Sequence, residues 1–106
     1  MKTNLGQIAL IGNHLPRQCG IATFTTDLAE AIAGQCKFAS VFAISVNDRV
    51  DGYRYPPRVK FEIEENEVAS YRRAAQYLNF NNVDVVSLQH EYGIFGGTAG
   101  SHILVL

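Results

Sequence analysis

The segment from Phe38 to Val46 is almost wholly apolar, and it constrains the fold more than any other part of the chain. A strand without alternating polar residues is typical of a central strand covered on both faces, as in a parallel sheet. The apolar run 8–11 has the length of a further buried strand, and another is expected at 83–88 from Val83, Val85, Val86 and Leu88. Parallel strands need crossover connections, which are usually helices. The apolar runs therefore favour an α/β fold with an open, mostly parallel sheet.

Two other segments show the periodicity of helices that pack one face on a sheet. The first helix is expected from about Ile21 to Gln35. The second is expected from an N-cap at Asn66, with Glu67 in its first turn, to Asn79. The apolar stripe of the first is predicted at Ile21, Phe24, Leu28 and Ile32. The stripe of the second is predicted at Val68, Tyr71, Ala75 and Leu78.

The remaining strand is expected at 59–64, where apolar and charged residues alternate as on a half-exposed edge strand. The polar stretch 47–57 before it predicts a surface loop. The element order β-α-β-β-α-β then gives the spatial strand order 3-2-1-4. Strands two and three form either an antiparallel hairpin or a parallel pair joined by an irregular loop. In both cases the crevice between the ends of strands one and four is the topological switch point, where such sheets bind ligands.

Length and composition limit the classes of function. The 106 residues carry a net charge of -1 and no run of Lys or Arg, so nucleic acid is not an expected partner. Cys19 and Cys36 have neither metal-knuckle spacing nor the pattern of a disulfide scaffold, so no metal is predicted and a reducing compartment fits. No stretch has the length of a transmembrane segment, and no leader is recognised. We expect one domain over residues 1–106, cytoplasmic, either free or peripheral at the inner face of the membrane.

The loop 12–26 rises from the first strand into a helix N-terminus, where unpaired N–H groups and the helix dipole suit a phosphate or a carboxylate. Gly20 would let the backbone approach the anion, Arg17 would add a charge, and Thr23 or Thr25 a hydroxyl. The alternative is that Gly20 only caps the helix and that Arg17 is solvated. The spacing fits neither the dinucleotide-binding glycine pattern nor the P-loop, and no cofactor is predicted.

The loop 89–97 follows the last strand. His90 and Glu91 come directly after that strand, and both side chains can hydrogen-bond hydroxyl groups. A lone His at a strand end is more often structural than catalytic, but the adjacent Glu and the glycine-rich turn favour function. Tyr92 suits the lining of a site for a sugar or for an aromatic ligand. A zinc-protease motif is excluded, because Ile94 stands where the second His belongs.

Cys19 lies near the expected helix N-terminus, an arrangement that lowers the pKa of a thiol. As a nucleophile it would take His14 or His90 as its base. No oxyanion-hole pattern and no third partner accompany it, so a cysteine hydrolase is the weaker hypothesis.

The segments PRQCGIATFTTDLAEAI and VVSLQHEYGIFGG together resemble the N-terminal domain of family 4 (group 1) glycosyltransferases. The likeness is to the bacterial subgroup with an R-x-C-G-I-A-T-F motif and a Q-H-E-[FY]-G-I-F-G-G motif. It covers the chain from Ile8 to about Gly100. Neither motif is a generic glycine pattern, so the occurrence of both in one chain makes the resemblance to this subgroup specific.

Such enzymes have two Rossmann-like domains, and they transfer a sugar from a nucleotide-sugar donor with retention of configuration, usually without an essential metal. The resemblance implies a Rossmann-like domain that mainly receives a carbohydrate or lipid-linked acceptor. It implies contacts to the donor diphosphate from the side chain of Arg17 and from backbone N–H groups of Cys19, Gly20 and Ile21. His90 would correspond to the cleft histidine near the transferred sugar, with Glu91 beside it as the second candidate catalytic residue. Acceptor or sugar contacts are expected at His14, Thr23, Gln89, Tyr92 and Gly93.

The family holds most of the nucleotide with a C-terminal domain, which this chain lacks. We therefore expect a truncated N-terminal domain that is inactive alone, and whose apolar tail 101–106, the expected start of a helix, favours self-association. The alternative is a non-catalytic α/β module whose loops bind a small anion or a partner protein.

Overall fold

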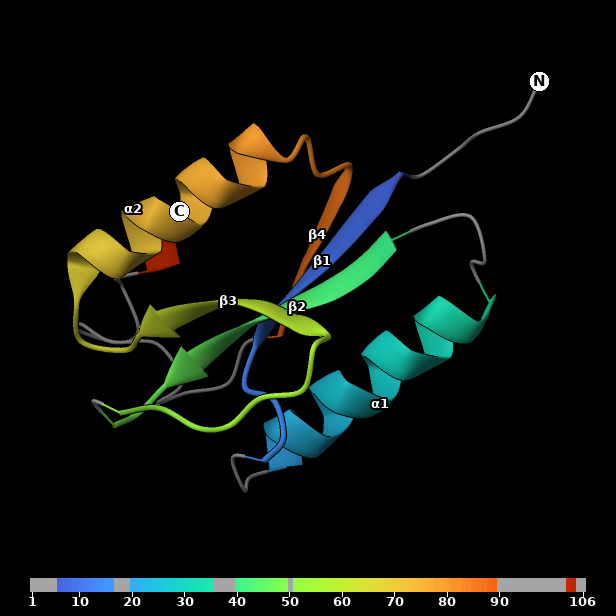
Figure 1. The fold of residues 1–106 in the computed structure, drawn as a ribbon, viewed down its shortest axis with the longest axis horizontal. Helices are drawn as coiled ribbons and strands as arrows, with labels where there is room; N and C mark the ends of the chain where they lie inside the picture. Colours follow the sequence, from blue (N-terminus) through green and yellow to red (C-terminus); the bar gives the residue numbers. More distant parts are fainter. Residues whose placement is uncertain (1–5, 17–19, 36–39, 50, 90–102, 105–106) are drawn as a thin grey trace.

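The computed structural model describes residues 6–16, 20–35, 40–49, 51–89 and 103–104, which form three layers (Figure 1). The strands are β1 (Gln7–Gly12), β2 (Ser40–Asn47), β3 (Val59–Glu64) and β4 (Val85–Leu88). The helices are α1 (Gly20–Gln35) and α2 (Val68–Phe80), and they cover opposite faces of the sheet (Figure 1). The α/β class and the Rossmann-like open sheet expected from the sequence are confirmed.

The strands lie in the predicted order β3-β2-β1-β4, and all three neighbouring pairs are parallel. The alternative left open for β2 and β3 is thereby decided in favour of the parallel pair. In the described part of their connection, residues 48–49 and 51–58, there is no helix. β1 lies between β2 and β4, so the first strand of the chain is an inner strand of the sheet. The start of β1 is joined to the start of β4 by Asp84, whose carboxylate accepts hydrogen bonds from Gly6 N at 2.7 Å and Gln7 N at 2.9 Å.

The alternating side chains of the two central strands divide the core into two clusters. Ala9 and Ile11 belong to the cluster on the α2 side, and Ile8 and Leu10 to the cluster on the α1 side. As predicted for a central strand, β2 is buried from residue 41 to residue 47. β3 is the edge strand expected from its alternation, with Ile63 as its buried residue.

The inner face of α1 differs from the predicted stripe. The buried residues are Ala22, Thr25 and Ala29, whereas Phe24 is 53% exposed. Small side chains at the centre of the contact let the helix axis approach the sheet, so the large residues flank the contact. Leu28 packs there while half-buried. Phe24 lies about a third of a turn from the centre of this buried face.

The start of α2 also differs from the prediction. The N-cap is Glu67, without a side-chain cap, and not Asn66. The first helical hydrogen bond runs from Ser70 N to Glu67 O at 2.9 Å, so Asn66 is one residue too early. The Ser70 hydroxyl joins the first turn of α2 to the end of β3, because it accepts from Glu64 N at 2.9 Å and donates to Glu67 O at 2.7 Å.

β4 is shorter and less covered than the buried strand predicted at 83–88. Val85, Val86 and Leu88 are 39%, 46% and 44% exposed. β4 pairs only with β1 among the described strands, so one of its edges has no neighbour there. An apolar groove lies between β4 and α2, and Ile103 lines it. Of the tail 101–106, the structure describes only Ile103 and Leu104, in a short 3-10 turn.

Candidate functional site

The two loops singled out by the sequence begin side by side. β1 and β4 are parallel neighbours, and Gln89 N donates to Ile11 O at 2.8 Å just where both strands end. Gly12 fits tightly there, because a Cβ on it would lie 2.9 Å from Gln89 Cβ and 3.2 Å from Gln89 O. The predicted switch point is therefore a real juxtaposition of the two loop starts.

The described beginning of the first loop turns from the core to the surface. Asn13 and His14 are buried, whereas Leu15 and Pro16 are exposed. The loop is tied to α1 through Thr26, whose hydroxyl accepts from Leu15 N at 3.2 Å and donates to Ala22 O at 2.8 Å. This segment is thus held against the second turn of the helix.

The N-terminus of α1 has the properties expected of an anion site. Gly20 is the first helical residue, it is exposed, and a Cβ on it would meet nothing within 4 Å. No acidic residue occupies the first turn, so no carboxylate of that turn offsets the positive end of the helix dipole. The side chain of Ile21 packs on the core, which leaves its backbone N–H as the group suited to a ligand.

The two candidate threonines of α1 have different environments. Thr23 is exposed and faces solvent, where it can contact a ligand bound at the surface. Thr25 is 0% exposed and faces the sheet, and its Oγ1 would lie 3.4 Å from a Cβ on Gly12. Thr25 therefore lies against Gly12, where the first loop begins, whereas Thr23 lies on the solvent-exposed side of α1.

Six of the predicted site residues lie outside the described residues. They are Arg17, Cys19, His90, Glu91, Tyr92 and Gly93. The roles assigned to them stay predictions, and the geometry of the site rests on His14, Gly20, Ile21, Thr23 and Gln89. Gln89 is half-buried, and its amide donates to Ser87 Oγ at 2.8 Å.

Three buried polar atoms near the switch point have no hydrogen-bond partner among the described residues. They are His14 Nε2, Thr25 Oγ1 and Ser45 Oγ. Unpaired buried groups are rare in folded proteins and call for a specific cause. Ser45 is the residue that the sequence interpretation missed. A signal for it was present, because it is a polar residue inside the apolar run that became β2.

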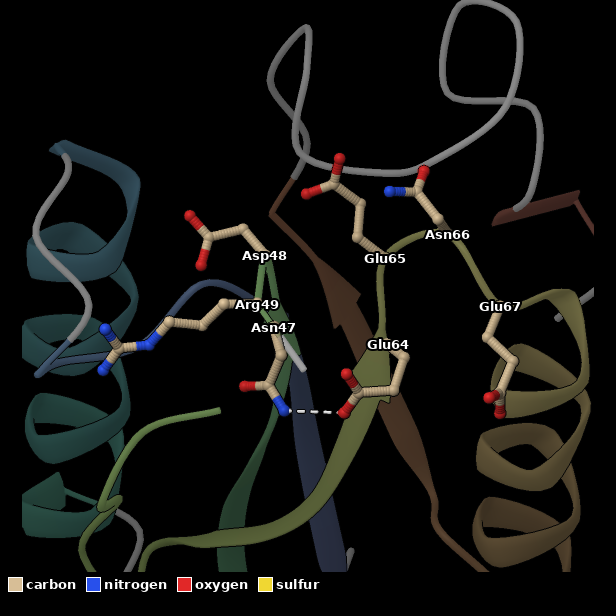
Figure 2. Close-up of a pocket in the computed structure, with 7 residues that line it drawn as sticks. All are labelled: Asn47, Asp48, Arg49, Glu64, Glu65, Asn66 and Glu67. Atoms are coloured by element: carbon tan, nitrogen blue, oxygen red, sulfur yellow. Dashed lines mark hydrogen bonds between the residues drawn. The ribbon is translucent and has the colours of Figure 1, made fainter. Parts of the chain in front are cut away.

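A second polar cluster lies at the ends of β2 and β3, around a hollow of about 560 Å³ (Figure 2). Asn47, 2% exposed, is at its centre. Its amide nitrogen donates to Glu62 Oε1 and to Glu64 Oε2, both at 2.9 Å, and its Oδ1 accepts from the Tyr55 hydroxyl at 2.5 Å. Every polar atom of the Asn47 side chain is therefore paired, which indicates a structural role.

The carboxylates around this hollow do not converge. Figure 2 shows Asp48, Glu64, Glu65 and Glu67 pointing in different directions. Asp48 accepts from the Tyr53 hydroxyl at 2.6 Å, and the guanidinium of Arg49 lies 4.1 Å from the centre of the Tyr53 ring. Within the described part of the chain, no group of three His, Cys, Asp or Glu could hold a metal ion.

One ion pair joins α1 to the segment that precedes β3. Arg58 binds Glu30 with two nitrogens, Nε at 2.9 Å and Nη2 at 3.0 Å, and its Nη1 donates to Val41 O at 2.9 Å. The hydrogen bond from Arg58 lowers the pKa of Glu30 below its ordinary value, with smaller contributions from the charges of Arg58 and His14. The pKa of Arg58 is raised in turn, mainly by its hydrogen bond to Glu30. Arg58 therefore joins α1 to β2 and to the segment before β3.

Comparison of the chain with family models, with curated proteins and with solved structures gives no match. In the described residues, no helix is both long and apolar enough to cross a membrane. The assignment of a function therefore depends on the motifs and on the geometry of the switch point.

Proposed function

We propose that this chain is the acceptor-side, N-terminal domain of a retaining group 1 glycosyltransferase. The enzyme would transfer a sugar from a nucleotide-sugar donor to a carbohydrate or lipid-linked acceptor. The proposal is carried by one observation, the contact between Gly12 and Gln89. It brings together the starts of the two loops that resemble the family's motifs, at the edge of the sheet where open α/β proteins bind ligands.

In this proposal the first loop binds the donor diphosphate. The N–H groups of Gly20 and Ile21 are directed along the axis of α1, a helix of 16 residues without acidic residues in its first turn. Arg17 and the N–H of Cys19 would add to the same site. Charge that develops on the leaving diphosphate would be stabilised by these groups.

The second loop and the buried histidine would hold the sugars. His90 positions the transferred sugar or assists the acceptor, and Glu91 is the second candidate for proton transfer. Gln89, Tyr92 and Gly93 would line the acceptor side. The nucleotide is held mainly by a second domain, so the 106 residues alone are not expected to turn over.

The test uses the polypeptide as its natural host produces it, incubated with UDP-glucose, UDP-galactose and GDP-mannose and a mixed acceptor extract. Transfer of labelled sugar with retention is expected. Gly20→Val should abolish it without unfolding the protein, because a side chain there meets open space but blocks the approach of the diphosphate. Gly34→Val is the matched control, since Gly34 lies in the same helix and has equally open surroundings. Equal loss of activity in both variants, or none in either, would remove the loop from the mechanism.

The alternative function is a non-catalytic module that binds a small anion. It is favoured by the same exposed N-terminus of α1, which suits an anion without any second domain. An intact mass equal to this 11.7 kDa chain, together with phosphate binding and no sugar transfer, would support the module.

A further inference from the structure

The three buried polar atoms near the switch point, His14 Nε2, Thr25 Oγ1 and Ser45 Oγ, lack hydrogen-bond partners among the described residues. His14 is 1% exposed, and Thr25 and Ser45 are 0% exposed. Each loses its hydrogen bonds to water on folding and regains none from the described residues, which opposes folding. Three such groups at one end of one sheet suggest that a ligand supplies the missing partners.

Thr25 and Ser45 flank the same glycine. Ser45 is the partner of Gly12 in the β1–β2 register, and it faces α1 because its neighbours in β2 belong to the core cluster on the α2 side. Thr25 faces Gly12 from α1, with its Oγ1 3.4 Å from the position of a Cβ. The two hydroxyls therefore lie on the same side of the sheet, around the residue that has no side chain.

His14 follows Gly12 by two residues and lies on the same side. The next residue is bound to α1, because Leu15 N donates to the Thr26 hydroxyl at 3.2 Å. His14 is buried, and the two residues that follow it, Leu15 and Pro16, are exposed. A ligand would approach it from that segment.

The imidazole has a defined tautomer. His14 Nδ1 lies 2.8 Å from Leu15 O, and a carbonyl oxygen can only accept. The proton of the neutral ring is therefore on Nδ1, and Nε2 presents a lone pair. A lone pair repels an anion and accepts from a hydroxyl group. Ser and Thr hydroxyls complement it, because each can both donate and accept.

We propose that His14, Thr25 and Ser45 form a hydroxyl-binding site beneath the first loop, in which Nε2 accepts a hydrogen bond from a sugar hydroxyl. The choice of a sugar as the ligand rests on the proposed function. The site is separate from the surface N–H groups of Gly20 and Ile21, which suit a phosphate. Recognition of the hydroxyl and recognition of the anion can therefore be measured independently.

The test is NMR of the 106-residue chain, with long-range proton–nitrogen spectra of the imidazole and amide spectra of the backbone. The probes are the methyl α-glycosides of glucose, galactose and mannose, with tetrahydropyran as a ring without hydroxyls and pyrophosphate as an anion. We expect the Nδ1–H tautomer, and a shift of the His14 Nε2 resonance with at least one glycoside but not with tetrahydropyran. Pyrophosphate should move the amides of Gly20 and Ile21 instead.

Variants separate a binding role from a packing role. Ser45→Ala should weaken glycoside binding about fivefold, the equivalent of one hydrogen bond, and His14→Phe should abolish it. Ser45→Ala should melt at or above the wild-type temperature, because an unpaired buried group is removed. His14→Phe also loses the hydrogen bond from Nδ1 to Leu15 O, so its melting temperature is measured as a check that the variant is folded. Ser40→Ala, which removes an exposed hydroxyl at the other end of β2, should leave the Nε2 response unchanged.

Two results would overturn the site while bearing differently on the proposed function. If no glycoside moves Nε2 but pyrophosphate moves the α1 amides, the hydroxyl site is wrong and donor binding at the first loop stands. If neither probe binds, both proposals lose their support. An unchanged glycoside affinity in Ser45→Ala and His14→Phe would also refute the site.

Discussion

Two adjacent threonines of α1 allow the unpaired-atom argument to be tested by stability alone. Thr25→Val and Thr26→Val make the same exchange of a hydroxyl for a methyl in the same helix, so the change in helix propensity cancels. Thr25 Oγ1 is buried without a partner among the described residues. Thr26 Oγ1 has two partners, Leu15 N at 3.2 Å and Ala22 O at 2.8 Å.

The expected effects have opposite signs. Burial of an unpaired hydroxyl costs about 1–3 kcal/mol. Thr25→Val should therefore stabilise the chain by about 1 kcal/mol. We expect the lower end of the range because the new methyl group is larger than the hydroxyl and lies beside Gly12. Thr26→Val loses two hydrogen bonds of about 0.5–1.5 kcal/mol each in a partly exposed place, for a net loss of about 1 kcal/mol. The two variants should therefore differ by about 2 kcal/mol in the free energy of unfolding.

The assay is urea unfolding followed by circular dichroism, with thermal melts as a second measurement. A difference of about 2 kcal/mol corresponds to melting temperatures roughly 8–16 °C apart for a domain of this size. The urea slopes should be equal, since the surface exposed on unfolding is the same. If Thr25→Val is as destabilising as Thr26→Val, then Oγ1 has a partner in solution, and the reasoning about the three buried atoms is refuted.

Three further predictions concern two residues at the ends of strands, Gly12 and Asn47, and one residue of α1, Glu30. Gly12→Ala should lower the free energy of unfolding by about 1–3 kcal/mol in urea titrations, because its Cβ has no space, whereas Gly34→Ala should raise it by up to about 1 kcal/mol. Asn47→Asp should destabilise by at least about 2 kcal/mol, since a buried carboxylate would replace an amide that donates to two carboxylates, and an unchanged melting temperature would contradict this. The pKa of Glu30 is lowered on folding, mainly by Arg58, so its stabilisation is complete above the ordinary value of 4.5 and is lost as the pH falls through the folded pKa. Glu30→Gln should thus be less stable than wild type by roughly half a kcal/mol at neutral pH and equally stable in acid, as measured by melts across that range.

The strand order and the switch point were predictable because they follow from local patterns and from general rules of chain connection. Continuous apolar runs indicated the covered strands, and the reversal of strand order around β1 followed from the element sequence. Both loops begin at that reversal. The hypothesis of a ligand site at Gly12 and Gln89 therefore needed no knowledge of side-chain contacts.

The errors arose where side chains from distant parts of the chain decide the result. Periodicity alone could not show that alanines would form the centre of the α1 contact and leave Phe24 exposed. The N-cap of α2 was misplaced because Ser70, within the helix, holds its first turn. The parallel pairing of β2 and β3 is supported by Asn47, whose amide joins both strand ends across 15 and 17 residues. Such partners are invisible in a window of sequence.

The inner position of β1 has a consequence for biosynthesis. One edge of β1 is paired by β4, and Asp84 fastens the two strands across 77 and 78 residues of sequence. While the ribosome is still adding residues before 88, the nascent chain carries an unpaired strand edge in the middle of its apolar core. Such an edge is a template for wrong pairing. We therefore expect the emerging polypeptide to depend on chaperones until its fourth strand leaves the exit tunnel, and a circular permutant that places β4 before β1 to relieve that dependence.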